Sequence, residues 1–226
     1  MSLPLRVNAL SVSAPSGRVL LTCEHFAAAP GETIGLRGPS GAGKSTFLYA
    51  IAGLQPKMTG SVDWGGCDLA RLGDGERARF RRENIGLIFQ DFLLFEELSA
   101  LGNATLATAF NKTGKRRSIR KTAERFLEKL GVPAERRTVD SFSGGERQRT
   151  AIARALAHDP AVILADEPTA SLDRATADAL ITDLTDLARV EKKTFIAVSH
   201  DLHLLERMDR VVDITDGRLT MEASPA

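Results

Sequence analysis

Short apolar runs alternate along this chain with longer stretches in which apolar residues recur at helical spacing. Residues Thr33 to Arg37, Ile85 to Phe89, Ala161 to Ala165 and Thr194 to Ser199 are four such short runs. Each has the length of a strand and is apolar enough to be buried on both faces, as strands of parallel sheets are. Their alternation with helical stretches predicts an α/β domain built on a parallel sheet.

Three of the longer stretches predict helices. Residues Lys44 to Leu54 follow helical spacing up to a turn at Pro56, whereas Lys115 to Leu130 and Asp173 to Val190 each carry one apolar stripe. The second of these stretches indicates a helical insert. The two stripes consist of Ile119, Ala123, Phe126, Leu127 and Leu130, and of Ala177, Leu180, Ile181, Leu184, Leu187 and Ala188.

Composition narrows the class of protein. With 226 residues, of which 43% are apolar, the chain can bury one large core or two small ones, and we expect one main domain with a subdomain. The formal net charge is +1 and basic residues are interspersed with acidic ones, so we expect no nucleic-acid partner.

The cysteines and the apolar runs bear on the compartment. Cys23 and Cys67 are too few and too isolated for a disulfide framework, which favours packing roles in a reducing environment. No uninterrupted apolar run reaches 18 residues, so we expect a chain that neither is secreted nor spans a membrane.

Residues 38 to 45 read Gly-Pro-Ser-Gly-Ala-Gly-Lys-Ser and satisfy the pattern of a phosphate-binding loop. In such a loop, backbone amides surround phosphates, Lys44 reaches the β and γ phosphates, and Ser45 offers a hydroxyl to Mg²⁺. A chance match in a glycine-rich turn is disfavoured, because a strand precedes the loop and a helix follows it. The predicted nucleotide-binding residues are Gly38, Pro39, Ser40, Gly41, Ala42, Gly43, Lys44, Ser45 and Thr46.

Two acids, Asp166 and Glu167, end the apolar run that starts at Val162. Ligands of open parallel sheets lie at the carboxyl ends of the strands. There Asp166 can hold Mg²⁺, and Glu167 can polarise a water for attack on the γ-phosphorus. Without the phosphate-binding loop we would interpret this pair as a surface turn, but with it the pair predicts a nucleoside triphosphatase.

Residues 141 to 149 read Ser-Phe-Ser-Gly-Gly-Glu-Arg-Gln-Arg, directly before the apolar helical run Ala151 to Ala157. Ser143 and Glu146 have the spacing of a capping box, so the segment can be interpreted simply as a helix start. Gly144 and Gly145, however, disfavour helix by roughly 1 kcal/mol each relative to alanine. We interpret these glycines as allowing an anion to approach the positive end of the helix dipole.

Taken together, these motifs resemble the ATP-binding subunit of an ABC transporter over essentially the whole chain. Further motifs of that family follow in the family's order: Gln90 after a strand, the turn Ser171-Leu-Asp173, and His200 after a strand. Residues 66 to 90 resemble more narrowly the cassettes of the lipoprotein-releasing and macrolide-export group.

The resemblance implies a P-loop NTPase of ABC type, with a mainly parallel sheet core, an antiparallel β subdomain and a helical subdomain. Residues 1–226 would be one ATPase domain, with the helical subdomain at about 91–158. ATP and Mg²⁺ would be the cofactors, with Ser45, Gln90 and Asp166 at the metal. Gln90 would also sense the attacking water and His200 would contact the γ-phosphate. On local pattern alone, either residue is an ordinary polar loop or strand-end residue.

The resemblance also implies partners. ATP would lie between two copies of the chain arranged head to tail, with Ser143, Gly144 and Gly145 facing the γ-phosphate held by the other copy and Asp173 linking the two sites. A separate integral membrane permease would hold the subunit at the cytoplasmic face of the cell membrane. The alternative is a soluble ABC-type ATPase in an assembly or metabolic complex.

Two departures from the family pattern stand out. The usual leucine and glutamine of the signature are Phe142 and Glu146 here, and the acid either weakens the approach of the γ-phosphate or strengthens the capping box. Residues Ser11 to Arg18 lack the aromatic on which the family usually stacks adenine. Arg18 could stack through its guanidinium, and we expect weak discrimination between bases.

Two other segments have alternative interpretations. The apolar segment Phe89 to Phe95 either packs in the core of the helical insert or forms a groove for a permease helix. The basic residues at 115–117, 120 and 121 predict a solvated helix face, with contact to anionic lipid as the alternative.

Overall fold

The computed structural model describes residues 2–110, 116–132 and 137–220. The strands in these ranges form one ten-stranded sheet, in the order β5-β4-β1-β2-β10-β9-β3-β8-β7-β6. They are β1 (Leu5–Ser13), β2 (Val19–Ala28), β3 (Thr33–Arg37), β4 (Met58–Trp64), β5 (Cys67–Asp68), β6 (Ile85–Ile88), β7 (Val162–Asp166), β8 (Thr194–Val198), β9 (Arg210–Thr215) and β10 (Arg218–Thr220).

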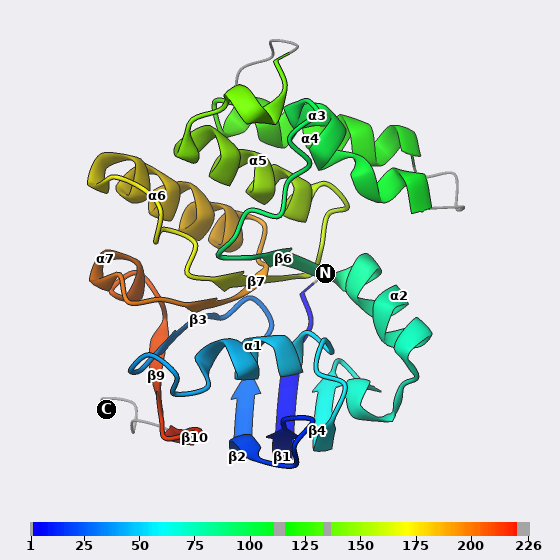
Figure 1. Ribbon diagram of the computed structural model, residues 1–226, viewed down its shortest axis with the longest axis vertical. Helices are drawn as coiled ribbons and strands as arrows, with labels where there is room; N and C mark the ends of the chain where they lie inside the picture. Colours follow the sequence, from blue (N-terminus) through cyan, green and yellow to red (C-terminus); the bar gives the residue numbers. More distant parts are fainter. Residues whose placement is uncertain (1, 111–115, 133–136, 221–226) are drawn as a thin grey trace.

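The sheet has a parallel part and an antiparallel part. Strands β6, β7, β8, β3 and β9 are parallel to one another, which confirms the predicted parallel core. Strands β1, β2, β4 and β5 pair antiparallel, as the resemblance implied. Strand β10 joins the two parts, because it pairs antiparallel with β9 and parallel with β2. In Figure 1, β1, β2 and β4 lie below α1, and β3, β6 and β7 lie above it.

Helices cover the parallel part, and two of the three predicted helices have nearly the predicted limits. Helix α4 begins at Arg116, and Lys115 lies outside the described residues. Helix α1 ends at Ile51, three residues before the predicted Leu54, because Gly53 turns to a φ of 66°. The helices are α1 (Lys44–Ile51), α2 (Asp74–Asn84), α3 (Ala100–Ala104), α4 (Arg116–Lys129), α5 (Gly144–Leu156), α6 (Arg174–Val190) and α7 (Leu202–Leu205), with 3₁₀ turns at Leu69–Arg71, Leu106–Phe110 and Val139–Ser141.

The parallel strands are buried on both faces because their side chains alternate between two hydrophobic clusters. On β7, Val162 and Leu164 face the cluster that contains α1 and the antiparallel strands. Ile163 and Ala165 face the cluster that contains α4, α5 and α6. The two clusters pack against opposite faces of β7 and hold the strand in place. The acids at the end of this strand are thereby held in place as well.

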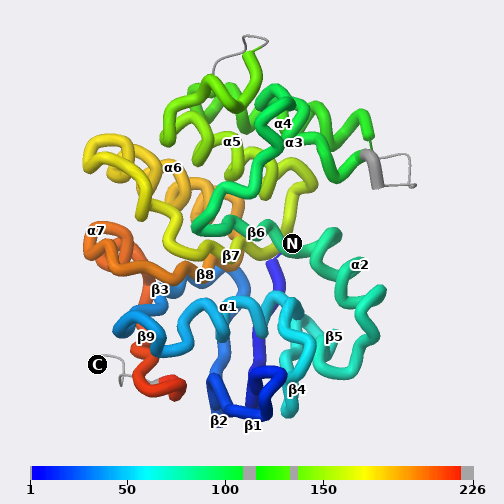
Figure 2. The backbone as a smooth tube through the Cα atoms, in the orientation of Figure 1, coloured from blue at the N-terminus to red at the C-terminus, as the bar shows by residue number. Residues whose placement is uncertain are grey.

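Helices α3, α4 and α5 pack against one another and form a layer above the core strands (Figure 2). The side chains of Ile119, Ala123 and Phe126 are buried in this layer, whereas Arg116, Arg120 and other basic residues of α4 are exposed, as expected of a solvated face. Within the described ranges, the structure contains no helix with the length and hydropathy needed to cross a membrane.

Candidate functional site

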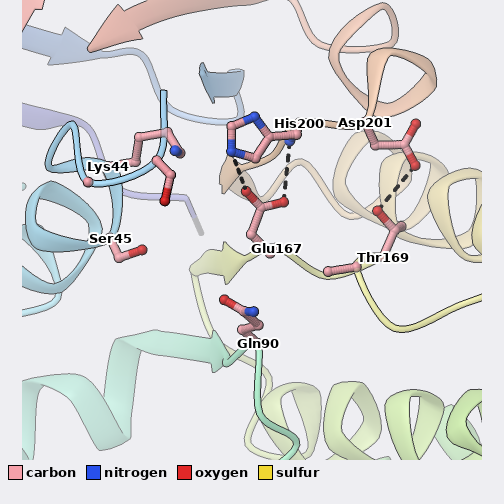
Figure 3. A pocket seen from close by; sticks show the side chains of 10 residues that line it. Lys44, Ser45, Gln90, Glu167, Thr169, His200 and Asp201 are labelled. Carbon is pink, nitrogen blue, oxygen red and sulfur yellow. Dashed lines mark hydrogen bonds and ion pairs between the residues drawn. The ribbon is translucent and has the colours of Figure 1, made fainter. Parts of the chain in front are cut away.

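A cleft opens where the core strands β3, β6, β7 and β8 end. Parallel strands deliver the segments that follow them to one edge of the sheet, so residues far apart in sequence meet there. The cleft has a volume of about 480 Å³. In Figure 3, Glu167 lies between His200 and Gln90, with Lys44 and Ser45 opposite. The lining residues are Ser40, Gly41, Lys44, Ser45, Gln90, Glu167, Thr169, Ala170, His200 and Asp201.

The loop between β3 and α1 needs glycine at two points. Gly38 has a φ of 153°, and a Cβ atom there would lie 2.0 Å from the backbone oxygen of Ile214. Gly43 is the N-cap of α1 with a φ of 101°, a conformation that residues with a side chain rarely adopt. The loop can therefore bend tightly onto the start of α1, where unpaired helix amides point outward.

Lys44 lies inside this loop. Its Nζ donates to the backbone oxygens of Gly38 at 2.9 Å and Pro39 at 3.0 Å, and the residue is only 7% exposed. Carbonyl oxygens accept both of these bonds, and among the residues that the structure describes no acid forms an ion pair with the ammonium. A buried positive charge beside the N-terminus of α1 makes this end of the cleft suited to a polyanion.

Ser45 lines the cleft and contacts Asp166, which is buried and is not among the lining residues. The hydroxyl of Ser45 donates to Oδ1 of Asp166 at 2.9 Å, and the phenol of Tyr49 donates to Oδ2 at 2.7 Å. Burial raises the pKa of Tyr49, and the hydrogen bond to Asp166 adds to the effect, so the phenol stays a donor. Sequence reasoning missed Tyr49, although its spacing of four residues from Ser45 places both on one helical face.

Glu167 projects into the cleft from a strained backbone. Its φ is 47°, in the left-handed region, and its N–H donates to the backbone oxygen of Val198 at 2.9 Å. Oε2 accepts from the backbone N–H of His200 at 3.3 Å, and Nε2 of His200 lies 3.5 Å from Oε1. Burial raises the pKa of Glu167, and the hydrogen bond from His200 opposes this rise. Such a carboxylate is a stronger base than an exposed one.

Thr169 and Asp201 complete the far side of the cleft and were not predicted from the sequence. Thr169 Oγ1 donates to Oδ2 of Asp201 at 3.2 Å, and Arg174 Nη1 donates to Oδ1 at 3.1 Å. These contacts tie the segment that follows Glu167 to the segment that follows His200. A threonine and an aspartate in loops give no local sequence signal for such a link.

Gln90 is exposed at the end of β6, and an arginine holds the loop that follows it. Arg154 of α5 donates to the backbone oxygens of Leu93 and, at 2.9 Å, of Phe92. In the apolar segment around these residues, Leu93 is 58% exposed and Phe95 is 53% exposed. Core packing therefore does not account for the whole segment.

The segment around Ser143 starts α5 as the capping-box prediction states. Ser143 Oγ accepts from the N–H of Glu146 at 3.3 Å, and Oε2 of Glu146 accepts from the N–H of Ser143 at 2.8 Å. Arg137, which sequence reasoning missed, donates to Oε1 of Glu146 at 2.8 Å. The backbone hydrogen bond from Ser143, together with Arg137, lowers the pKa of Glu146.

The residues Ser143, Gly144, Gly145 and Asp173 do not line the cleft of their own chain. They gather instead where α5 and α6 begin. A Cβ atom on Gly145 would lie 3.0 Å from Cγ2 of Thr176, in the first turn of α6. Approach of an anion is therefore not the only reason for these glycines, since a side chain at Gly145 would crowd Thr176.

A second hollow, of about 290 Å³, adjoins the outer side of the phosphate-binding loop. It shares Ser40 and Gly41 with the cleft, so one extended ligand can occupy both. Its lining contains no aromatic ring, as expected from residues 11 to 18. The lining residues are Arg18, Val19, Leu20, Pro39, Ser40, Gly41, Ala42, Asp216 and Gly217.

This fold and this loop-lined cleft define a P-loop nucleoside triphosphatase, and the family model for ABC transporters matches residues 23–170. The chain belongs to the ABC transporter family. It is an ATP-binding subunit of that family, and it hydrolyses ATP.

Individual relatives agree with this assignment. An ABC transporter ATP-binding protein of Mycobacterium tuberculosis is 42% identical over 191 residues, covering 84% of this chain and 77% of the relative. The lipoprotein-releasing system ATP-binding protein LolD of Zymomonas mobilis is 40% identical over 193 residues, covering 85% of this chain and 83% of the relative.

Solved structures show the same fold. The ATP-binding cassette MJ0796, solved as a dimer in a post-hydrolysis state bound to ADP and Pi, has a TM-score of 0.86 at 33% identity over 97% of both chains. The protein cbiO1 of Clostridium perfringens, part of the ABC transporter complex cbiONQ, has a TM-score of 0.85 at 25% identity, covering 98% of this chain and 88% of that one.

Proposed function

We propose that the chain hydrolyses ATP in the cleft with Glu167 as the general base. The observation that carries this proposal is the position of Glu167, which is held by the N–H of His200 and lies opposite Lys44. Its raised pKa increases its affinity for the proton of an attacking water. His200, whose Nε2 is 3.5 Å from Glu167, is the residue that contacts the γ-phosphate.

The phosphates bind along the loop from Gly38 to Thr46. Amides at the start of α1 and the ammonium of Lys44 supply positive charge to them. Lys44 exchanges its bonds to the backbone oxygens of Gly38 and Pro39 for bonds to phosphate oxygens. The base then lies in the hollow beside Arg18, on the outer side of the loop.

Mg²⁺ fits the oxygen donors at the end of the cleft that Ser45 lines. The hydroxyl of Ser45, the carboxylate of Asp166 and the amide oxygen of Gln90 are hard ligands, which this ion prefers. The 2.9 Å contact between Ser45 and Asp166 brings two of them together. When bound, Mg²⁺ neutralises charge on the phosphates, and Ser45, Asp166 and Gln90 hold it in place.

A second copy of the chain completes each site. The cleft lacks the residues Ser143, Gly144 and Gly145, although they expose a helix N-terminus suited to an anion. A head-to-tail dimer brings them to the γ-phosphate held by the other copy, with Asp173 between the two sites. The cassette MJ0796, which was solved as a dimer, supports the association of two copies.

The partner that uses the free energy of ATP hydrolysis is an integral membrane permease, which holds the subunit at the cytoplasmic face of the membrane. Exposed Leu93 and Phe95, in the loop after Gln90, supply an apolar surface for a permease helix. The relative from Zymomonas mobilis, named for a lipoprotein-releasing system, supports a transport role. We further propose that residues 1–226 act as one ATPase domain, with its helical subdomain at about 91–158.

Two measurements test this function. Purified chain should release phosphate from ATP only when Mg²⁺ is present, and chain recovered from detergent-solubilised membranes should carry an integral membrane protein. Recovery with soluble partners alone would support a soluble assembly or metabolic ATPase instead. Absence of phosphate release under all conditions would contradict the catalytic part of the proposal.

A further inference from the structure

Tyr49 takes part in the metal end of the cleft, although no motif of the chain includes it. It lies one turn after Ser45 on α1, so both side chains project from the same helical face toward β7. Ser45 donates to Oδ1 of Asp166 at 2.9 Å and Tyr49 donates to Oδ2 at 2.7 Å. The two carboxylate oxygens are thus each held by a hydroxyl from one helix.

The orientation of Asp166 depends on these two donors. The terminal torsion of an aspartate is broad, so its carboxylate plane is set by its hydrogen bonds. Asp166 is only 2% exposed, so bulk water does not take the place of a missing donor. If Ser45 gives its hydroxyl to a metal, Tyr49 is the side-chain donor that remains on Asp166 among the residues the structure describes.

The ring of Tyr49 has a second contact. It packs against the ring of Phe89, with centroids 6.1 Å apart and an interplanar angle of 47°. Phe89 immediately precedes Gln90. Tyr49 therefore contacts both the strand end that carries Asp166 and the strand end that carries Gln90. The ring contact needs no hydroxyl, so packing alone would be served equally well by phenylalanine.

We propose that Tyr49 is a positioning residue for the nucleotide's divalent metal. Its hydroxyl fixes the plane of the Asp166 carboxylate, and its ring fixes the strand end before Gln90. This inference rests on the proposed function, in which Ser45, Asp166 and Gln90 hold the metal. Tyr49 acts through these residues and does not itself contact the nucleotide.

The decisive variant is Tyr49→Phe, which removes the hydroxyl and keeps the ring. Mn²⁺ serves as the probe, titrated by electron paramagnetic resonance into protein loaded with a non-hydrolysable ATP analogue. Loss of a partner of a metal ligand typically weakens metal binding tenfold or more, so we expect Mn²⁺ affinity to fall roughly tenfold. Affinity for the analogue in EDTA should stay within about twofold of wild type.

Two further readouts separate positioning from a structural role. Tyr49 is the only tyrosine of the chain, so wild-type protein should show a tyrosine absorbance difference on adding Mn²⁺. Hydrolysis by Tyr49→Phe should return to the wild-type rate at saturating Mg²⁺. Tyr49→Leu, which also removes the ring, should remain slower at saturating Mg²⁺, and equal saturated rates for the two variants would overturn the role of the ring.

Unchanged Mn²⁺ affinity in Tyr49→Phe would overturn the inference. A loss of analogue affinity in EDTA as large as the loss of Mn²⁺ affinity would overturn it as well. Asp166→Asn keeps this failure distinct from failure of the proposed function. If Asp166→Asn weakens Mn²⁺ binding and Tyr49→Phe does not, only the role of Tyr49 is wrong. If Asp166→Asn itself binds Mn²⁺ like wild type, the assignment of the metal residues is wrong.

Discussion

The guanidinium of Arg137 lies 2.8 Å from Oε1 of Glu146, in the first turn of the helix that Ser143 caps. Glu146 replaces the glutamine usual in the family, and an unpaired acid there would repel a γ-phosphate. Arg137 supplies the compensating charge, while Oε2 of Glu146 accepts from the N–H of Ser143. Because Arg137 compensates its charge, Glu146 strengthens the helix cap without weakening the binding of the γ-phosphate.

Replacing Arg137 by alanine tests this compensation. The pair is partly exposed, so its loss should destabilise the chain by only about 1 kcal/mol in urea unfolding. ATP hydrolysis should fall roughly fivefold, the equivalent of about 1 kcal/mol in the barrier, because the charge of Glu146 then faces the phosphate.

Glu146→Gln is the matched rescue, because its amide oxygen still accepts from the N–H of Ser143. We expect the double variant Arg137→Ala with Glu146→Gln to hydrolyse ATP faster than Arg137→Ala alone. If the loss of activity in the double variant equals the sum of the losses in the two single variants, the residues act independently and Arg137 does not compensate the acid.

The hydrogen bond from the N–H of Ser143, with Arg137, makes the contribution of Glu146 to stability depend on pH. The folded-state pKa of Glu146 is lowered from its ordinary 4.5, so its stabilising contribution is present above pH 4.5 and is lost as pH falls through the folded pKa. The difference in melting temperature between wild type and Glu146→Gln should therefore shrink as pH falls below 4.5. A difference that stays constant from pH 7 down to the acid limit of folding would contradict the lowered pKa of Glu146.

The hollow beside Arg18 and Val19 predicts weak base discrimination. Base stacking on an aromatic ring contributes about 1 to 3 kcal/mol, and the residues lining this hollow supply no ring. Calorimetry should give ATP and GTP affinities within about tenfold of each other, and far tighter binding of ATP would contradict this expectation.

Arg18→Ala and Arg18→Lys show whether the guanidinium replaces the missing ring. Lysine keeps the charge and loses the planar group, so both variants should weaken ATP and GTP alike if stacking matters. Retained affinity in Arg18→Lys would assign the contribution of Arg18 to charge alone.

Lys44→Ala should remove nucleotide binding. The buried ammonium of Lys44 supplies the positive charge of the loop. Without it, the carbonyl oxygens of Gly38 and Pro39 would repel a phosphate brought beside them. We expect at least a hundredfold loss of affinity, or about 2.7 kcal/mol, measured with a fluorescent ATP analogue. Lys57→Ala, at an exposed position outside the cleft, is the control and should bind normally.

The elements that could be predicted from the sequence are those governed by local physics. The apolar runs that became β7 and β8 are buried on both faces, and their ends place Glu167 and His200 at one sheet edge. The capping box at Ser143 was also predictable, because both of its partners lie within one helical turn.

Contacts between distant segments could not be predicted in this way. Tyr49 and Asp166 are 117 residues apart, and Arg154 reaches carbonyl oxygens 61 and 62 residues away. A tyrosine or an arginine on a helix has no local pattern that names its partner, since tertiary packing selects it. The limit of α1 differed for another reason, which is local: Gly53 adopts a left-handed turn and ends the helix, whereas the prediction followed the apolar pattern up to Leu54.

The central claim is that Glu167 is the base for ATP hydrolysis between two copies of the chain. The most direct test is Glu167→Gln, which keeps the shape of the side chain and removes its basicity. We expect it to bind ATP, to run as a dimer in light scattering with ATP and Mg²⁺, and to release phosphate at least a hundredfold more slowly. Phosphate release by Glu167→Gln at the wild-type rate would show that Glu167 is not the base.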